Sequence, residues 1–261
     1  MLYKTTPQGV VLLYLIKQIF SGILFVMNDE ESIVAQAKVF AKQHKVAIAK
    51  EITNTLVYKS ETNPVSVFMA GSPGAGKTES SIRLIEELSD GSASILRIDA
   101  DEYRKYFSYY KGYNSHLFHG AVSIIVEKVH DLALKNKQSF VFDGTLSDYK
   151  KAVENIERSI SKDRLVQIIY VYQEPLLAWE FTKKREGVEG RRILKQDFIS
   201  KFFKLRETVN SLKETFKNKI TIDLIIKDID NSELRYEKNI QKIDDFIKHK
   251  FSLQELDNLL E

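Results

Sequence analysis

Residues 69–80 read MAGSPGAGKTES and follow an apolar run, PVSVF, at 64–68. Gly71, four further residues, and then Gly76, Lys77 and Thr78 have the spacing of a P-loop. Glycines let successive N–H groups turn toward phosphate oxygens, and the following helix adds positive potential at its N-terminus. A glycine-rich turn without a ligand is the alternative, but strand, loop and helix follow in the required order. The expected nucleotide-binding residues are Gly71, Ser72, Pro73, Gly74, Ala75, Gly76, Lys77 and Thr78.

The chain beyond Pro64 alternates strand-like and helix-like segments. Expected strands are VSVFMA (65–70), SILRI (94–98), SFVFD (139–143), LVQIIYVY (165–172) and ITIDLIIK (220–227). Strands separated by helices indicate a mainly parallel sheet covered on both faces, in which ligands bind at the carboxyl ends of the strands. We therefore predict a three-layer α/β P-loop kinase fold over residues 64–261. The last 30 residues, 232–261, read as one or two helices outside the sheet.

Residues 1–63 read as a helical extension that ends at the turn-like segment Ser60–Pro64. Its apolar run, Val10–Val26, has Lys17 and Gln18 at its centre, and a charge at mid-bilayer costs roughly 2.5–3.5 kcal/mol. We therefore expect a short apolar helix packed on the domain or against a partner, and no membrane contact. Met27 is an alternative start of the chain.

Two further helices are expected within this extension. Asn28 with Glu31 has the pattern of a capping box, which predicts a helix start there. A second helical stretch covers residues 46–56. The extension serves either as scaffolding or as an inhibitory element in place of an antitoxin.

Composition excludes several kinds of partner. The net charge is only +3, which argues against a nucleic-acid partner. There are no cysteines, hence no disulfides, as is compatible with a cytoplasmic protein. With five histidines and no HExxH pattern, we expect no zinc site.

Other P-loop classes lack their diagnostic residues. The NKxD motif that specifies guanine is absent, since the most similar segment, NKQS at 136–139, lacks the aspartate. The strand ending at Asp143 continues with Gly144 and not with a water-activating glutamate. A phosphotransferase with a hydroxyl acceptor remains, and it needs a base and cations for the transferred group.

Two segments can supply these groups. RIDADEYRK (97–105) places Asp99 and Asp101 after the second strand, and from spacing alone either is the base or a helix cap. FTKKREGVEGRRILKQ (181–196) is a basic, glycine-interrupted segment. We expect it to form a lid whose arginines close over the phosphates, the alternative being a solvated helix end.

As an ordered set, GSPGAGKT, RIDADEYRK, VEKVHDLALKNKQSFVFDGT and KKREGVEGRRILKQ resemble the zeta-toxin family of P-loop kinases over Pro64–Ile226. The resemblance implies ATP- or GTP-dependent, Mg²⁺-assisted phosphorylation of the 3′-hydroxyl of a nucleotide sugar, UDP-N-acetylglucosamine. This reaction inhibits cell-wall synthesis, and an antitoxin protein restrains it.

The resemblance also assigns roles by position. Lys77 and Thr78 match the phosphate and magnesium residues, and Asp101 matches the general base. The implied acceptor-side residues are Glu127, Asp143 and Thr145, with Asp143 also beside Thr78 at the metal. The implied lid arginines are Arg185 and Arg191, with Arg192 a rival for the second. Independently of the family, the aromatic and amide-rich loop 108–120 suits an acceptor pocket and adds His119.

Some positions depart from the family. Ala100 replaces an amide, Asp143 replaces a glutamate and Leu194 replaces a proline that often follows the second arginine. Glu127 has the alternative of being an ordinary charge on a helix surface. The open alternatives are a kinase of another small hydroxyl acceptor (an antibiotic, a nucleoside or a polynucleotide end) and a non-catalytic nucleotide-binding module.

Overall fold

The computed structural model describes residues 7–88, 95–144, 146–189, 193–247 and 249–260, with only the backbone of residues 7–28. Its sheet has six strands in the order β2-β3-β1-β4-β5-β6. Neighbouring strands are parallel except for β6, which is antiparallel to β5. The strands are β1 (Val65–Ala70), β2 (Leu96–Asp99), β3 (Phe140–Asp143), β4 (Leu165–Tyr172), β5 (Thr221–Lys227) and β6 (Glu233–Glu237). This confirms the predicted α/β fold and its mainly parallel sheet.

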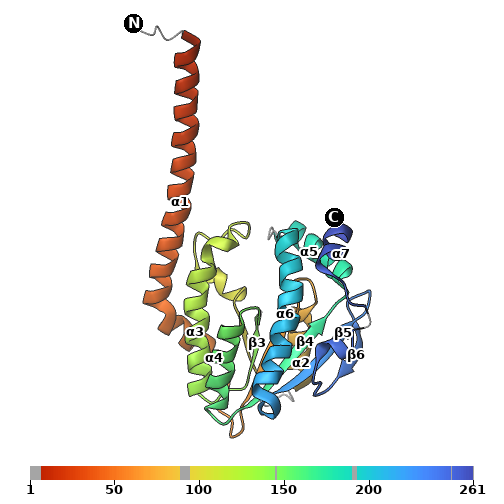
Figure 1. The fold of residues 1–261 in the computed structure, drawn as a ribbon. Helices are drawn as coiled ribbons and strands as arrows, with labels where there is room; N and C mark the ends of the chain where they lie inside the picture. The colour runs from red at the N-terminus through yellow and green to blue at the C-terminus, as the bar shows by residue number, and fades with distance from the viewer. Residues whose placement is uncertain (1–6, 89–94, 145, 190–192, 248, 261) are drawn as a thin grey trace.

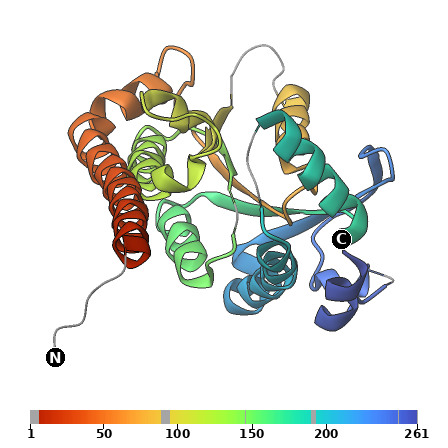
Figure 2. The ribbon, with the colours of Figure 1, turned by 90° about the horizontal axis from the view of Figure 1, so that it is seen from above.

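Helices cover both faces of the sheet, as Figure 2 shows along the strand ends. They are α1 (Pro7–Ile52), α2 (Lys77–Leu88), α3 (His119–Lys135), α4 (Tyr149–Ile160), α5 (Pro175–Glu189), α6 (Lys195–Phe216) and α7 (Leu253–Leu259). Side chains alternate between faces along a strand. Phe68 therefore joins the core beneath α1, α3, α4 and α6, whereas Val67 and Met69 join the core beneath α2.

The N-terminal extension differs from expectation because α1 is a single helix (Figure 1). The predicted helix start at Asn28 is wrong, since Asn28 lies inside α1. Apolar residues precede Asn28 and they favour continuing the helix over starting a new one. The N-terminal part of α1 extends beyond the α/β domain and is not packed on it. Among the helices that the structure describes, none is both long and apolar enough to cross a membrane.

The C-terminal half of α1 belongs to the main core. Ala37, Ala41, Ile48 and Ala49 are buried in the same cluster as the sheet residues. The connection from α1 to β1 is also tied to the sheet at its amino end. The buried Gln138 Nε2 donates to Thr53 O at 3.0 Å and to Tyr58 O at 2.7 Å, and Ser139 Oγ donates to Glu61 Oε2 at 2.7 Å.

The C-terminal segment is also different from the predicted pair of helices. Residues 233–237 form the edge strand β6, and only α7 is an α-helix within the described part of residues 232–261. Tyr236 in β6 donates its hydroxyl proton to the buried Asp223 in β5. Asn239 N also donates to Asp223 Oδ1, at 2.9 Å. β6 is stabilised by pairing with β5, and this tertiary contact cannot be read from the local sequence preferences that suggested a helix.

Candidate active site

The P-loop connects β1 to α2, and α2 begins at Lys77. Gly74 and Gly76 have φ values of +71° and +82°, in the region that favours glycine. A Cβ on Gly74 would lie 2.0 Å from the carbonyl oxygen of Ala178 in α5, and one on Gly76 would lie 2.6 Å from Asn231 Oδ1. The loop is therefore enclosed by α5 and by the β5–β6 connection, with room for backbone but not for side chains.

Lys77 lies inside this loop. Its Nζ donates to the carbonyl oxygens of Gly71 and Ser72, both at 2.8 Å. Burial of the ammonium lowers the pKa of Lys77 to about 8, although Asp143 and Asp101 act in the opposite direction. Arg185 adds to the lowering of this pKa. These four side chains therefore lie close enough to influence one another electrostatically.

Two carboxylates stand side by side at the carboxyl ends of β2 and β3. Asp99 is paired in register with Asp143, and both are buried. Arg97 Nη2 lies 2.7 Å from Asp99 Oδ2 and also contacts Asp143 Oδ2. Burial raises the pKa of Asp99 to about 6, with Arg97 opposing the shift and Asp143 adding to it. One guanidinium therefore contacts both carboxyl groups at this edge of the sheet.

Asp101 follows β2 at the start of the 3₁₀ turn η1 (Glu102–Tyr106). Its backbone N–H donates to Asp99 Oδ1 at 2.8 Å. Its carboxylate pairs with the buried Arg104, and its Oδ2 lies 4.0 Å from Arg185 Nη2 in α5. As a helix cap, Asp101 makes no side-chain hydrogen bond. The carboxylate therefore lies between two guanidinium groups, those of Arg104 and Arg185.

The basic segment is more helical than expected. Residues 181–189 continue α5, so Gly187 does not interrupt the helix. The Glu174 carboxylate accepts hydrogen bonds from the N–H groups of Leu176 and Leu177 at 3.0 and 3.1 Å, which secures the start of α5. Arg185 lies on this helix with 45% of its side chain exposed. The other predicted lid arginine, Arg191, and its rival Arg192 lie outside the described residues, as does Thr145.

Two predicted acceptor residues, His119 and Glu127, lie on α3. His119 is exposed at the first residue of α3. Glu127 lies eight residues later, about 12 Å along the helix axis. Its carboxylate lies 3.4 Å from Lys151 Nζ and 3.9 Å from Arg158 Nη1, both in α4. These ion pairs join α3 to α4, and contact of Glu127 with a sugar stays a prediction.

The described residues fit a magnesium ion that is held by only one or two protein side chains. The described residues contain no group of three or more Asp, Glu, His or Cys side chains arranged around a metal. Mg²⁺ commonly takes one or two protein oxygens and completes its shell with phosphate and water. Thr78, in the first turn of α2, and Asp143 are residues of the required chemistry.

Sequence reasoning did not single out three residues of the site. Arg97 and Arg104 pair with the strand-end acids, and Ser81 Oγ lies 3.0 Å from Asp143 Oδ2. The spacing carried a signal for two of the three. Arg97 shares a strand face with Asp99, and Ser81 is one helical turn from Thr78.

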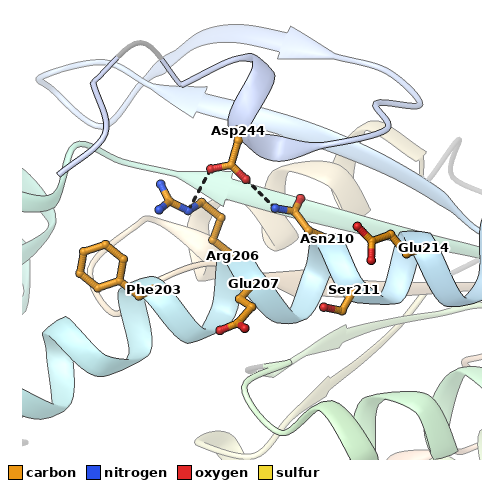
Figure 3. Close-up of a pocket in the computed structure, with 7 residues that line it drawn as sticks. All are labelled: Phe203, Arg206, Glu207, Asn210, Ser211, Glu214 and Asp244. Carbon is orange, nitrogen blue, oxygen red and sulfur yellow. Dashed lines mark hydrogen bonds and ion pairs between the residues drawn. The ribbon is translucent and has the colours of Figure 1, made fainter. Parts of the chain in front are cut away.

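A cavity of about 330 Å³ lies against α6 and contains none of the predicted site residues (Figure 3). Within it, Arg206 Nε and Asn210 Nδ2 contact opposite oxygens of Asp244, at 3.4 and 2.6 Å. Its lining residues are Phe203, Arg206, Glu207, Asn210, Ser211, Glu214 and Asp244.

Comparison with known proteins agrees with the fold and the loop. A family model described as "Zeta toxin" matches residues 49–241. No curated protein matches the chain. A structure from the PezAT chromosomal toxin–antitoxin system of Streptococcus pneumoniae is similar, with a TM-score of 0.58 and 18% identity over 85% of this chain and 86% of that one.

The AvrRxo1-ORF1:AvrRxo1-ORF2 complex is a second similar structure. In its sulphate-containing form the TM-score is 0.54 at 14% identity, with 82% of this chain and 70% of that chain covered. In the form with ATP, the TM-score is 0.53 at 15% identity, with 78% and 64% covered. At these identities the likeness is one of fold.

Proposed function

Because the chain belongs to the zeta toxin family, we propose that it is a P-loop kinase that transfers the γ-phosphoryl group of ATP or GTP to the 3′-hydroxyl of UDP-N-acetylglucosamine. One observation carries the proposal. The P-loop lysine, Lys77, is half-buried and lies in electrostatic range of Asp101 and Asp143, and Arg185 Nη2 lies 4.0 Å from Asp101 Oδ2 at the carboxyl edge of the sheet. A kinase needs this combination of cations and carboxylates around one phosphate site.

The geometry suggests a role for each side chain in the transfer. Asp101 accepts the proton of the sugar 3′-hydroxyl. The hydroxyl oxygen bonds to the γ-phosphorus, and the bond from that phosphorus to the β–γ bridging oxygen breaks. Lys77 and Arg185 offset the negative charge on the γ-phosphoryl group and the departing nucleoside diphosphate. Arg104 holds the Asp101 carboxylate in place. Mg²⁺, held through Thr78 and Asp143, would supply further neutralisation of the phosphates.

We also propose that this kinase reaction is toxic to bacteria and that an antitoxin protein restrains the enzyme. The family assignment supports this, and one structural neighbour comes from a toxin–antitoxin system. The neighbour that binds ATP supports ATP as the phosphoryl donor. Glu127, His119, Thr145 and Arg191 remain proposed acceptor-side and lid residues.

The test is direct phosphorylation of the nucleotide sugar. Purified chain is incubated with ATP, Mg²⁺ and UDP-N-acetylglucosamine, and the products are analysed by mass spectrometry. Lys77→Ala removes the phosphate-binding ammonium, and Lys150→Ala, at an exposed position of α4, is the matched control. We expect phosphorylated sugar nucleotide with the wild type and Lys150→Ala, and a loss of at least about a hundredfold with Lys77→Ala.

The alternative functions predict other outcomes. ADP formation without a phosphorylated sugar would indicate a different hydroxyl acceptor, with Ala100 and Asp143 as the first residues to examine. A non-catalytic module would bind ATP without turnover, and Asp101→Asn would then change nothing. In a kinase, Asp101→Asn retains ATP binding and loses turnover.

A further inference from the structure

Arg97, the first residue of the RIDADEYRK segment, has several partners at the carboxyl edge of the sheet, and no role was assigned to it above. Only 14% of its side chain is exposed. All three guanidinium nitrogens have partners: Nη2 contacts Asp99 and Asp143, Nη1 lies 2.5 Å from Glu102 Oε1, and Nε donates to Ser81 Oγ at 3.1 Å. One guanidinium therefore joins β2, β3, η1 and α2.

We propose that Arg97 is a positioning residue that sets both carboxylates of the reaction, Asp143 by direct contact and Asp101 through Asp99. This inference rests on the proposed function, because it concerns the same site. Arg97 does not touch the reacting atoms in this scheme. It acts by fixing where the two carboxylates point.

The first step is electrostatic. Asp99 and Asp143 are register partners on adjacent parallel strands and both are buried. Two like charges at this separation repel strongly in a poorly solvated site unless a cation lies between them. The planar fork of an arginine meets several oxygens at once, which a lysine ammonium does with much less directional control.

The second step is the connection to Asp101. Asp99 Oδ2 binds Arg97, and Asp99 Oδ1 accepts the backbone N–H of Asp101 at 2.8 Å. Asp99 is thus held at both oxygens, and it fixes the backbone from which the Asp101 side chain extends. Rotation of Asp99 after loss of Arg97 would release that hydrogen bond.

The third step is the connection to the P-loop helix. Ser81 Oγ accepts from Arg97 Nε and lies within hydrogen-bond distance of Asp143 Oδ2 and of Thr78 O, at 3.0 and 2.9 Å. A hydroxyl has one proton, so it donates to one of these two oxygens at a time. Arg97 therefore also ties Asp143 to the turn of α2 that carries Thr78, the other proposed metal ligand.

The experiment compares Arg97→Met and Arg97→Lys with the wild type. Arg83→Met is the matched control, because Arg83 lies on α2 with 61% of its side chain exposed and pairs with Glu87 one turn away. The readouts are the Kd of ATP with Mg²⁺ and with EDTA, and kcat and KM for phosphorylation of UDP-N-acetylglucosamine. Thermal unfolding of each variant reports its stability.

We expect the Kd of ATP in EDTA to stay within about twofold, because the P-loop contacts of Lys77 do not involve Arg97. The gain in ATP affinity on adding Mg²⁺ should fall about 10- to 100-fold, and kcat should fall by a similar factor with little change in the KM for UDP-N-acetylglucosamine. Arg97→Lys should not restore either quantity. Arg83→Met should match the wild type.

A folding defect is separated from a positioning defect by a double variant. Arg97→Met leaves two buried acids without their cation, whereas Arg97→Met with Asp99→Asn removes one charge as well. The double variant should recover part of the thermal stability and none of the kcat. Recovery of kcat together with stability would overturn the positioning role.

Other results would also overturn it. Tighter Mg²⁺ binding in Arg97→Met would mean that Arg97 competes with the metal for Asp143. An ATP affinity of the wild type that does not respond to Mg²⁺ would remove the metal role of Asp143 on which the inference depends. Failure to phosphorylate UDP-N-acetylglucosamine contradicts the proposed acceptor instead, and the Mg²⁺ dependence of ATP binding then still decides the role of Arg97.

Discussion

Asp99 and Asp143 are register partners at the carboxyl ends of β2 and β3, although 44 positions separate them in the chain. Both carboxylates bind the same guanidinium nitrogen, Nη2 of Arg97. Asp143 of this pair also acts on the charge of Lys77, together with Asp101 and Arg185, so cations and carboxylates that a phosphoryl-transfer site requires lie near one another. Burial, together with the adjacent Asp143, raises the pKa of Asp99 to about 6 despite the nearby arginine.

The charge of Lys77 predicts a pH dependence of nucleotide binding. Burial lowers the pKa of Lys77 from 10.5 to about 8, so the free chain loses this ammonium as the pH rises through about 8. We expect the affinity for ATP without Mg²⁺ to be constant below this pH. Above it, the affinity should fall by up to tenfold per pH unit, because the nucleotide must bind the protonated form.

Titration of a fluorescent ATP analogue between about pH 7 and about pH 9.5 measures this effect. Lys77→Met, which has no ammonium to titrate, should bind weakly at every pH and show a flat profile. A steep profile in Lys77→Met would assign the pH dependence to another group. The same shift makes the free energy of unfolding rise between about pH 8 and pH 10.5, since the unfolded chain there binds the extra proton.

Arg185 should act on turnover more than on nucleotide binding. Its Nη2 lies 4.0 Å from Asp101 Oδ2, on the helix that encloses the P-loop. We expect Arg185→Ala to lower kcat by about a hundredfold or more, because an arginine at the transferring group acts mainly on the transition state. Lys184→Ala, at the adjacent exposed position of α5, is the control and should leave kcat within about twofold. Equal losses in the two variants would point to a general effect of helix charge.

Two glycine substitutions test how tightly α5 covers the P-loop. Gly74→Ala places a Cβ 2.0 Å from Ala178 O at a φ of +71°, so we expect a loss of at least about 2 kcal/mol in the free energy of unfolding. Gly187→Ala lies in α5 with no atom within 4 Å of the new Cβ, and it should stabilise the helix by roughly 0.5–1 kcal/mol. Chemical denaturation of both variants measures the two values. A neutral Gly74→Ala would contradict the close approach of α5 to the loop.

We expect the N-terminal extension to be removable up to Met27 but not up to Asn63. A chain that starts at Met27 keeps the buried residues Ala37, Ala41, Ile48 and Ala49, and we expect its melting temperature to match that of the full chain within about 3 °C. A chain that starts at Asn63 loses this part of the core together with Glu61 and the carbonyls of Thr53 and Tyr58. It should fail to unfold cooperatively. Circular dichroism melts distinguish the two, and a stable chain starting at Asn63 would contradict the shared core.

These truncations also address an inhibitory role of the extension. Greater kinase activity or toxicity of the chain that starts at Met27 would support inhibition by residues 1–26. Equal activity would restrict any inhibitory element to the helical half that is part of the core.

Much of the architecture follows from local sequence. The P-loop glycines and helix α2 are local features, and the strands β1 and β4 have the predicted bounds because buried parallel strands are short continuous apolar runs. Local spacing predicts Lys77 in the P-loop and Asp99, Asp101 and Asp143 at strand ends, since ligands of a parallel sheet gather at one edge. The choice of Asp101 as the base and of Arg185 as a lid residue comes from the family resemblance, and both roles stay predictions.

Tertiary structure decided what local patterns left open. β6 exists because β5 offers an edge and Asp223 a partner for Tyr236. The contacts of the two candidate bases also come from the fold: Asp99 binds Arg97 at the sheet edge, and Asp101 lies against Arg104 and Arg185. By itself the sequence determined which groups the chain carries and at which edge they gather. Their pairing depends on distances between segments far apart in the chain, and only the folded structure sets those distances.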